Sequence, residues 1–380
     1  MDDIALHAPL KGRRGSRTAL NTPVLVLDLD ALDRNIARMA ALVAARGMRL
    51  RPHAKTHKSV DIARRQIDAG AVGLCCAKLG EAEVLADGGI GGLLITSPVT
   101  APAAIDRLAA LAGRSPGLMA VADHPAVVAA TERALAAAGA PLGVVIDIDP
   151  GIRRTGVTGP DAAVALARAI AASPHLHFAG VQFYCGAHQH IEGYADRRAA
   201  TEERMAYLRT VIDALAAAGF APPIVTGGGT GTHRIDLDLG VFTELQAGSY
   251  VFMDRQYLDC DLADAPAPPF EPSLTVDTRV VSANHAALVT LDAGFKSLST
   301  DGGKPGVLHG APAEATFAFM GDEHGALIAP GIGETLQPGD PVTLIVPHCD
   351  PTVNLYDTYH VVRGDTLIDL WPVGARGRAR

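Results

Sequence analysis

The sequence predicts an α/β protein in which a (β/α)8 TIM-type barrel is followed by a C-terminal all-β domain. Short apolar segments alternate with Ala-rich amphipathic segments from residue 22 onward, in units of roughly 25–30 residues. About eight such units fit a closed barrel better than an open doubly wound sheet, and no GxGxxG motif follows the first segment. After a Pro-rich segment at 263–272, strand-like runs occur without long helices. We therefore expect a barrel at 22–260 and a β domain at 261–380, to which part of 1–21 is added.

The predicted barrel strands are short, apolar and rich in β-branched residues. They are expected at 24–29, 48–54, 72–78, 92–97, 117–123, 142–149, 178–184, 223–229 and 244–250. The segments between them carry apolar residues at i, i+3 and i+4 and often end at Gly, which is typical of surface helices. The clearest of these helices are expected at 30–46, 59–69, 125–138, 160–172 and 197–218. A strand followed by a helical crossover returns to a parallel neighbour, so the sheet should be parallel.

The composition excludes several classes of protein. Hydrophobic residues make up 48% and charged residues 19% of the chain, which is typical of a globular protein. The 33 basic and 41 acidic residues give a net charge of -8, which disfavours nucleic acid as a partner. No apolar run approaches the roughly 18 residues that span a bilayer, and 1–21 lacks the apolar core of a signal peptide. The five cysteines show no CxxC pair, so we expect a cytoplasmic protein without membrane contact.

The first candidate site is the segment RPHAKTHK, residues 51–58, at the end of the second predicted strand. Catalytic groups of barrels lie at the carboxyl ends of strands. Crowded positive charge and partial burial lower the pKa of a lysine and expose its nucleophilic amine. Lys55 lies next to the strand end, whereas Lys58 precedes a helix, which makes Lys55 the candidate nucleophile. A solvated basic loop is the alternative interpretation.

The second candidate site is the Gly-rich segment TGGGTGT, residues 226–232, after the eighth predicted strand. Consecutive glycines let backbone N–H groups approach an anion, and loops after the last barrel strands frequently hold phosphate. Gly248 and Ser249 offer further phosphate donors. A lysine together with a phosphate cradle, in the absence of a nucleotide motif, indicates pyridoxal phosphate (PLP) on a Schiff-base lysine.

The third candidate site is the segment PHCDP, residues 347–351, in the β domain. On an extended strand, His348 and Asp350 would point to the same side and Cys349 would point away. One imidazole and one carboxylate suit a divalent ion such as Mn2+, Mg2+ or Zn2+, with open positions for water or substrate. The acidic turn at 322–324 is either a source of a water-mediated metal contact or a solvated turn.

Three further side chains follow predicted strands. Arg154, after the sixth strand, is a candidate partner of the pyridine ring, where an always-charged guanidinium would leave the ring nitrogen unprotonated. Tyr184 is a candidate for lining or stacking beside the cofactor. His190, after the seventh strand, is a candidate general base. The alternative for His190 and its neighbour His188 is a role in loop hydrogen bonds.

Together these motifs resemble the D-threonine aldolase/D-serine dehydratase group of the alanine racemase fold type. The resemblance runs in order from about residue 22 to 376 and rests on TPVLVLDLDALDRNI, RPHAKTHKS, GLCCAKLGEAE, GVQFYCGAHQH, TGGGTGT, ELQAGSYVFMD, DEHG and PHCDPTVNLYD. It implies a PLP-bearing barrel joined to a β domain, usually as a homodimer with active sites near the subunit interface.

The resemblance also implies roles for particular residues. Lys55 becomes the Schiff-base lysine, Arg154 the partner of the pyridine nitrogen, and His190 the base near the substrate hydroxyl. The implied phosphate-binding residues are Thr230, Gly248, Ser249 and Tyr257, and the implied metal ligands are His348 and Asp350. One position departs from the pattern, because Ala77 stands where relatives often carry a Gln that faces the cofactor.

The nature of the second metal ligand favours one activity. Members that resemble D-serine dehydratase carry Cys, a soft ligand for zinc, where this chain has Asp350, as in D-threonine and 3-hydroxy-D-aspartate aldolases with Mn2+ or Mg2+. We therefore expect a lyase that cleaves a small D-β-hydroxy-α-amino acid to glycine and an aldehyde. The alternatives are a D-serine/D-threonine dehydratase, a 3-hydroxy-D-aspartate aldolase, a racemase using Tyr356 or Tyr359, a non-catalytic PLP carrier, and a PLP-free metal hydrolase.

Overall fold

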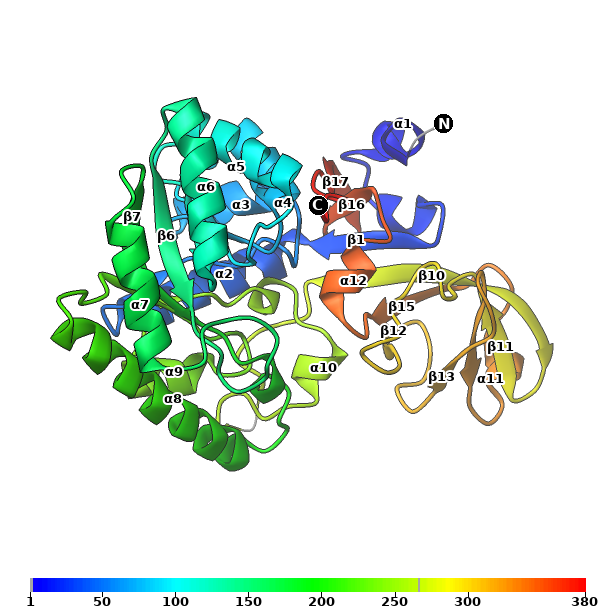
Figure 1. Ribbon diagram of the computed structural model, residues 1–380. Helices are drawn as coiled ribbons and strands as arrows, with labels where there is room; N and C mark the ends of the chain where they lie inside the picture. The colour runs from blue at the N-terminus through cyan, green and yellow to red at the C-terminus, as the bar shows by residue number, and fades with distance from the viewer. Residues whose placement is uncertain (1–2, 266) are drawn as a thin grey trace.

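The computed structural model describes residues 3–265 and 267–380, which form a barrel and a mixed β domain side by side (Figure 1). In the described chain, eight parallel strands curl into one sheet in the order β2-β9-β8-β7-β6-β5-β4-β3. These strands are β2 (Arg49–Leu50), β3 (Cys75–Cys76), β4 (Leu94–Ile95), β5 (Met119–Ala122), β6 (Leu142–Asp147), β7 (Leu176–Phe183), β8 (Ile224–Gly227) and β9 (Glu244–Leu245). The parallel sheet was predicted, although several strands are shorter than expected.

Helices cover the outside of the barrel, as the amphipathic pattern predicts. They are α2 (Leu29–Ala44), α3 (Val60–Asp68), α4 (Leu79–Asp87), α5 (Pro102–Arg114), α6 (Pro125–Ala138), α7 (Pro160–Ala171), α8 (Tyr194–Ala217) and α9 (His233–Leu239), whereas the short helix α10 (Arg255–Leu258) faces the β domain. Helix α6 begins at Pro125 and ends before Gly139, which adopts the left-handed conformation with a φ of 64°. The proline supplies a preset φ at the start, and the glycine ends the helix without a Cβ clash.

The two end strands of the curled sheet meet, which closes the barrel. A parallel bridge joins His53 to Cys75, and the Ala54 N–H donates to the Cys75 carbonyl over 2.7 Å. Below this point Arg51 forms a buried bidentate ion pair with Glu244 of β9, with distances of 2.9 and 2.8 Å. A small apolar cluster fills the barrel interior and contains Cys75, Leu94, Met119, Val121, Val145 and Ala179. The carboxyl ends of the strands therefore converge on one mouth.

The β domain is built on a nine-stranded mixed sheet of the described residues. Its strands are β1 (Val24–Asp28), β10 (Leu274–His285), β11 (Leu288–Leu291), β12 (Gly306–His309), β13 (Thr316–Phe319), β14 (Gly325–Ile328), β15 (Pro341–Ile345), β16 (Thr358–Arg363) and β17 (Thr366–Pro372). The short helices near this sheet are α1 (Asp3–His7), α11 (Ile332–Thr335) and α12 (Cys349–Val353). Short 3-10 turns occur at Ala8–Leu10, Ser16–Ala19, Gly186–His188 and Ser249–Val251.

One strand lies in a different sheet from the one predicted. Strand β1, expected as the first barrel strand, pairs antiparallel with β10 and parallel with β16. Its residues are almost all buried, and a strand buried on both faces reads as the same apolar run in either sheet. Strand β2 is therefore the first barrel strand, and the strands before Arg154, His190 and the Gly-rich segment are the fifth, sixth and seventh of the barrel.

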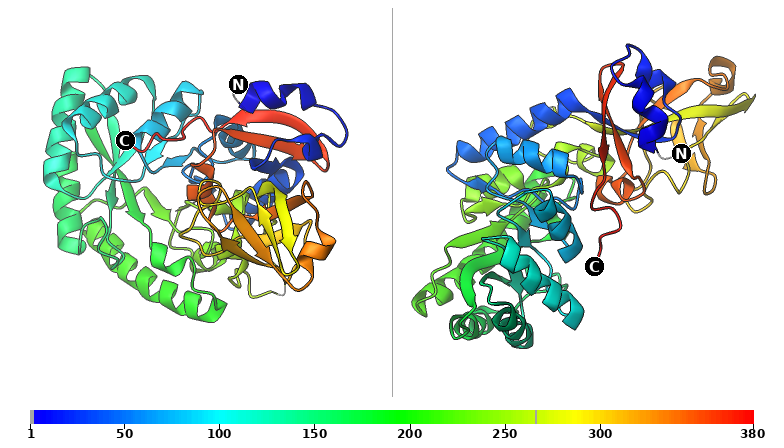
Figure 2. Two further views of the ribbon diagram at one scale, coloured as in Figure 1. Left: turned by 90° about the vertical axis from the view of Figure 1, so that its right-hand side faces the viewer. Right: turned by 90° about the horizontal axis from the view of Figure 1, so that it is seen from above.

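The chain crosses between the two parts more than once. After β17 the C-terminal tail returns to the barrel beside its cyan helices (Figure 2), and the Ala375 N–H donates to the Lys58 carbonyl over 3.0 Å. Tyr359 of β16 donates its hydroxyl to the His57 carbonyl over 2.6 Å. The loop that carries Lys55 is thus held from the β domain side. Across the described residues, none of the helices combines the length and apolarity needed to cross a bilayer.

Candidate active site

The two lysines of RPHAKTHK have different environments, as the strand geometry predicts. Lys58 is buried and forms an ion pair with Glu81 over 2.5 Å. Its backbone has a φ of 51°, which turns the chain into helix α3. Lys55 instead projects into a cavity of about 560 Å³ at the barrel mouth, with 39% of its side chain exposed. Lys55 is therefore the accessible amine of this segment.

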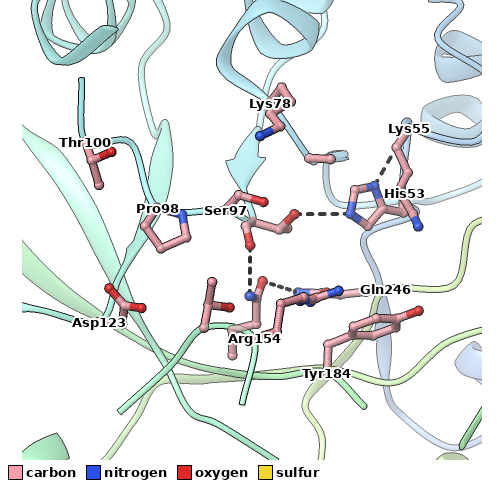
Figure 3. A pocket seen from close by; sticks show the side chains of 14 residues that line it. His53, Lys55, Lys78, Ser97, Pro98, Thr100, Asp123, Arg154, Tyr184 and Gln246 are labelled. Atoms are coloured by element: carbon pink, nitrogen blue, oxygen red, sulfur yellow. Dashed lines mark hydrogen bonds between the residues drawn. The ribbon is translucent and has the colours of Figure 1, made fainter. Parts of the chain in front are cut away.

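Polar side chains from several strand ends line the cavity (Figure 3). His53, Lys55 and Tyr184 lie on one side of it, and Thr100 and Asp123 lie on the opposite side. The complete lining is His53, Lys55, Ala77, Lys78, Thr96, Ser97, Pro98, Thr100, Asp123, Arg154, Thr155, Gln182, Tyr184 and Gln246. Of the predicted site residues, Lys55, Arg154 and Tyr184 are in this set.

Sequence reasoning missed the hydrogen-bonded floor of the cavity. Thr96 donates its hydroxyl to the Cys76 carbonyl, so it accepts the Nε2–H of His53 over 3.1 Å. Gln246 donates to the Gln182 side chain over 3.2 Å, and Gln182 donates to Asp147 over 2.9 Å. Burial raises the pKa of Asp147, against hydrogen bonds that lower it. Asp147 and Gln182 lie at the ends of β6 and β7, and Thr96 and Gln246 directly follow β4 and β9, so a position at a strand end was the available signal.

Arg154 and Tyr184 lie next to each other at the cavity. The Arg154 guanidinium lies 5.5 Å from the centre of the Tyr184 ring, within the range of a cation–π contact. Arg154 comes from the loop after β6, which Asp149 organises by accepting the N–H groups of Gly151 and Arg153. Arg154 is exposed at this position, and among the described residues its guanidinium has no ion-pair partner within 4 Å.

The Gly-rich segment forms a tight turn between β8 and α9. An ideal Cβ at Gly231 would lie 2.0 Å from the Gln189 carbonyl oxygen, and one at Gly229 would lie 2.3 Å from the Gln189 side chain. These glycines are therefore required for packing against the preceding loop. Thr230 is buried and accepts the Tyr250 N–H over 2.9 Å, which brings it beside the 248–249 turn.

The 248–257 segment packs against the loop that carries Lys55, although its residues are outside the lining of the cavity. An ideal Cβ at Gly248 would lie 2.6 Å from the Thr56 hydroxyl, so only glycine lets the two segments approach this closely. Ser249 and Tyr257 are buried beside it. The hydroxyls of Thr230, Ser249 and Tyr257 and the glycine backbone are the donor types that a phosphate needs. This part of the site fits the predicted cofactor.

His190 packs on Tyr257, with ring centres 4.6 Å apart. Partial burial, together with the nearby His348, lowers the pKa of His190 to about 4. His190 is therefore neutral near pH 7 and has a nitrogen that can accept a proton. His188 ends a short 3-10 turn of the same loop.

The PHCDP segment has a different backbone from the one predicted. Strand β15 ends at Ile345, and His348 is the residue before helix α12, so the alternation of an extended strand does not apply. The strand-to-helix turn nevertheless directs Asp350 toward the barrel, where its Oδ2 lies 3.1 Å from the Lys55 Nζ. Cys349 is fully buried, and its N–H donates to Asp254 over 2.9 Å, but its thiol lies 3.5 Å from the Asp350 Oδ1 rather than pointing away as predicted.

The Lys55–Asp350 pair reverses the predicted pKa shift of the lysine. The Asp350 carboxylate raises the pKa of Lys55, although burial lowers it. Burial would raise the pKa of Asp350, but the Lys55 ammonium and His348 hold it well below its usual value. The prediction of a lowered lysine pKa was wrong, because it counted the neighbouring cations of RPHAKTHK and not a carboxylate almost 300 residues away.

Two other clusters of polar side chains contain residue types that can bind a metal. The acidic turn at 322–324 is exposed, and Asp322 and Glu323 lie 3.7 and 2.5 Å from the Lys296 amine. In the described part of the chain, Asp3, His7 and His360 form the single group of three clustered metal-binding side chains. Their hydrogen bonds fix the tautomers, because His7 Nε2 accepts the Asn21 N–H over 3.0 Å. The Nδ1 that faces His360 therefore carries the proton and is closed to a metal.

Comparison with known proteins agrees with this geometry. The alanine racemase N-terminal domain model matches residues 27–256, and the serine dehydratase domain model matches residues 273–362. The 3-hydroxy-D-aspartate aldolase of Paracoccus denitrificans is 40% identical over 94% of this chain and 93% of its own. The D-threonine aldolase of an Arthrobacter species is 37% identical over 95% and 94%.

This chain belongs to the alanine racemase-fold family of these aldolases. The crystal structure of D-threonine aldolase from Filomicrobium marinum superposes with a TM-score of 0.92, at 38% identity, over 96% of this chain and 98% of that one. The barrel with a C-terminal β domain and the aldolase type of lyase are thereby confirmed at the level of the family. Ala77, the position singled out in the sequence, lines the cavity.

Proposed function

We propose that this protein is a PLP- and divalent-metal-dependent aldolase, which cleaves D-β-hydroxy-α-amino acids of the D-threonine type to glycine and an aldehyde. The supporting observation is the 3.1 Å contact between Lys55 and Asp350. This contact brings together a lysine of the barrel that could bind PLP and a carboxylate of the β domain that could bind a metal ion. The relatives' substrates are 3-hydroxy-D-aspartate and D-threonine, and both are D-β-hydroxy-α-amino acids.

We assign the cofactor to the cavity of Lys55. Its amine would hold PLP, with Arg154 at the ring nitrogen, Tyr184 beside the ring, and phosphate on Thr230, Gly248, Ser249 and Tyr257. When bound, PLP supplies an electron sink for the carbanion left at Cα. The support is the tight glycine turn against Thr56 and the buried hydroxyls beside it. Ala77 contributes only a methyl group to the lining of this cavity.

We assign the metal to His348 and Asp350. Mn2+ or Mg2+ is favoured by the carboxylate ligand, and Zn2+ is the alternative. A divalent ion lowers the pKa of a hydroxyl that it binds, which suits the β-hydroxyl of the substrate. His190, neutral at pH 7, accepts the hydroxyl proton as the Cα–Cβ bond breaks in a retro-aldol cleavage. The Cβ fragment would leave as the aldehyde, and the Cα carbanion would take up a proton to give glycine.

Two alternative activities receive unequal support. A dehydratase is favoured by the match of the serine dehydratase domain model to residues 273–362. A racemase would need a free tyrosine as second base. Tyr359 donates to the His57 carbonyl and Tyr356 to the Ser297 carbonyl, and burial raises the pKa of both phenols. We therefore retain the dehydratase as an alternative, together with a 3-hydroxy-D-aspartate aldolase, whose relative is 40% identical.

We further propose that the protein works in the cytoplasm as a homodimer. The dimer rests on the family resemblance. The cytoplasmic location rests on the five cysteines, which are all free and buried. Size-exclusion chromatography with light scattering tests the dimer, and a monomer with full activity would contradict it.

Removal of the metal ligands tests the proposed function. His348→Ala and Asp350→Ala should abolish aldehyde release from D-threonine with PLP and Mn2+, while the visible absorbance of bound PLP remains. His285→Ala, at an exposed position of the same domain, is the matched control and should behave like the wild type. Full activity of His348→Ala would contradict the metal role.

A further inference from the structure

Asp301 contacts the proposed metal ligand His348 from outside the predicted motifs. Its Oδ2 lies 2.8 Å from the Nδ1 of His348. A carboxylate near neutral pH only accepts hydrogen bonds, so the Nδ1 of His348 must carry the proton. The lone pair of the neutral ring is then on Nε2, and this nitrogen is the one available to a metal. Asp301 thus selects the tautomer that a ligand at Nε2 requires.

The segment around Asp301 also holds the backbone of His348. The Ser299 hydroxyl donates to the His348 carbonyl over 3.1 Å and accepts the His348 N–H over 3.2 Å. Thr352 donates to the same carbonyl over 2.7 Å and accepts the Ser299 N–H over 3.1 Å. An ideal Cβ at Gly302 would lie 2.8 Å from the Cβ of His348 and from the Pro347 carbonyl. The 299–302 segment therefore packs directly on His348, and both its main chain and its ring are fixed.

A structural role alone does not explain Asp301. Its side chain is 55% exposed, and that of His348 is 23% exposed. Among the described residues, His348 is the ion-pair partner that Asp301 has. Ion pairs this open to water contribute little to stability. Carboxylates that accept the second N–H of a metal-binding histidine, in contrast, orient the ring and make it a stronger ligand.

We propose that Asp301 is a positioning residue for the metal site, which orients His348 and fixes its tautomer. This inference rests on the proposed function, because it needs His348 to be a metal ligand. The strand-to-helix turn before α12 lies at the junction of the two domains (Figure 1), so the orientation of this ring decides whether Nε2 is presented to the barrel mouth.

Mn2+ affinity of the PLP-loaded protein tests this inference, with free Mn2+ measured by electron paramagnetic resonance. Asp301→Ala should raise the Kd for Mn2+ by about 10- to 100-fold without loss of bound PLP. Asp301→Glu, which keeps an acceptor, should recover part of the affinity. Asp357→Asn removes one charge from an exposed aspartate paired with Arg376, and it should leave the Kd unchanged.

The possible outcomes separate the two proposals. If the wild type binds Mn2+, His348→Ala does not, and Asp301→Ala binds like the wild type, the positioning role is overturned while the metal site stands. If His348→Ala binds Mn2+ like the wild type, the metal assignment itself fails, and the role of Asp301 fails with it. Equal losses of Mn2+ affinity in Asp301→Ala and Asp357→Asn would mean that the change in net charge causes the effect, and this outcome would also overturn the inference.

Discussion

Lys55 and Lys58 are three residues apart and have opposite roles in the structure. The sequence predicted which one faces the cavity, because Lys55 follows the predicted strand at 48–54 and Lys58 precedes a helix, although the observed strand β2 already ends at Leu50. The sequence did not reveal the partners, since Glu81 and Asp350 come from distant segments. Residue identity at strand ends was thus predictable, whereas the pKa of each lysine depends on contacts that only the fold creates.

Substitution of the lysines distinguishes their roles. Lys55→Ala should lose the adduct that borohydride reduction traps between PLP and the protein, because it removes the only amine we assign to the cofactor. Lys78→Ala, at the cavity rim, is the control and should keep the adduct. Peptide mass spectrometry after reduction gives the answer. An adduct preserved in Lys55→Ala would mean that another lysine holds the cofactor.

The His7–His360 pair gives the stability of the protein a pH dependence. His7 Nδ1 donates to His360 Nε2 over 2.8 Å, and His360 Nδ1 donates to the Leu25 carbonyl over 3.2 Å. Burial, with His7 beside it, lowers the pKa of His360 to about 4, against Asp3 and Asp277, which raise it. Because the folded pKa lies below the ordinary 6.5, this contribution to stability is present above pH 6.5 and is lost as the pH falls toward 4.

His360→Gln should therefore flatten the dependence of Tm on pH. We expect the wild type to lose about 1–2 kcal/mol more than the variant between pH 7 and pH 5. Thermal melts followed by circular dichroism at both pH values measure this difference. Parallel losses of Tm in the two proteins would show that the pair does not titrate as described.

At the scale of elements, loops after strands carry the site, and their conformations depend on packing between loops. The Gly-rich segment was predicted as an anion-binding turn, but its glycines also meet Gln189 and Asp236 from neighbouring elements. Strand β1 could not be assigned to the correct sheet from the sequence, because an apolar run does not indicate which sheet it joins. Helices were easier to predict from the sequence, because apolar periodicity and the terminal Pro and Gly of α6 are local signals.

A methyl group at Gly231 should disturb this loop. Gly231→Ala sets a Cβ against the Gln189 backbone, which must move, so we expect a loss of about 1–3 kcal/mol in stability. The Kd for PLP should rise at least severalfold, because Thr230 moves with the loop. Gly113→Ala in α5 is the matched control, since the nearest atom to its Cβ lies 3.9 Å away. Fluorescence titration with PLP measures the Kd for PLP of both variants. Equal PLP affinities in the two variants would contradict the assigned cradle.

At the scale of the whole molecule, one buried carboxylate joins the two halves of the site. Asp254 accepts the Tyr257 N–H over 3.1 Å through Oδ1 and the Cys349 N–H over 2.9 Å through Oδ2. Tyr257 belongs to the proposed phosphate cradle, and Cys349 lies between the proposed metal ligands. The sequence places Asp254 in a recognisable motif but gives no sign that it contacts the β domain, because this contact spans 95 residues.

Asp254→Ala should weaken the binding of both PLP and Mn2+. Two backbone donors lose their buried acceptor, which costs about 2–5 kcal/mol of stability. We expect both the Kd for PLP and the Kd for Mn2+ to rise, whereas Asp301→Ala should affect the metal alone. Paired titrations with PLP and with Mn2+ measure the two effects. If PLP affinity falls in Asp254→Ala with an unchanged Mn2+ affinity, the two halves are not coupled through this residue.

We propose that PLP on Lys55 and a metal ion on Asp350 act together in the cleavage of a Cα–Cβ bond. Proton NMR of the products from D-threonine, with PLP and Mn2+ and then with a chelator added, tests it most directly. Glycine and acetaldehyde, lost when the chelator is present, are the predicted result. Formation of 2-oxobutanoate and ammonia would contradict the aldolase and assign the protein to the dehydratases.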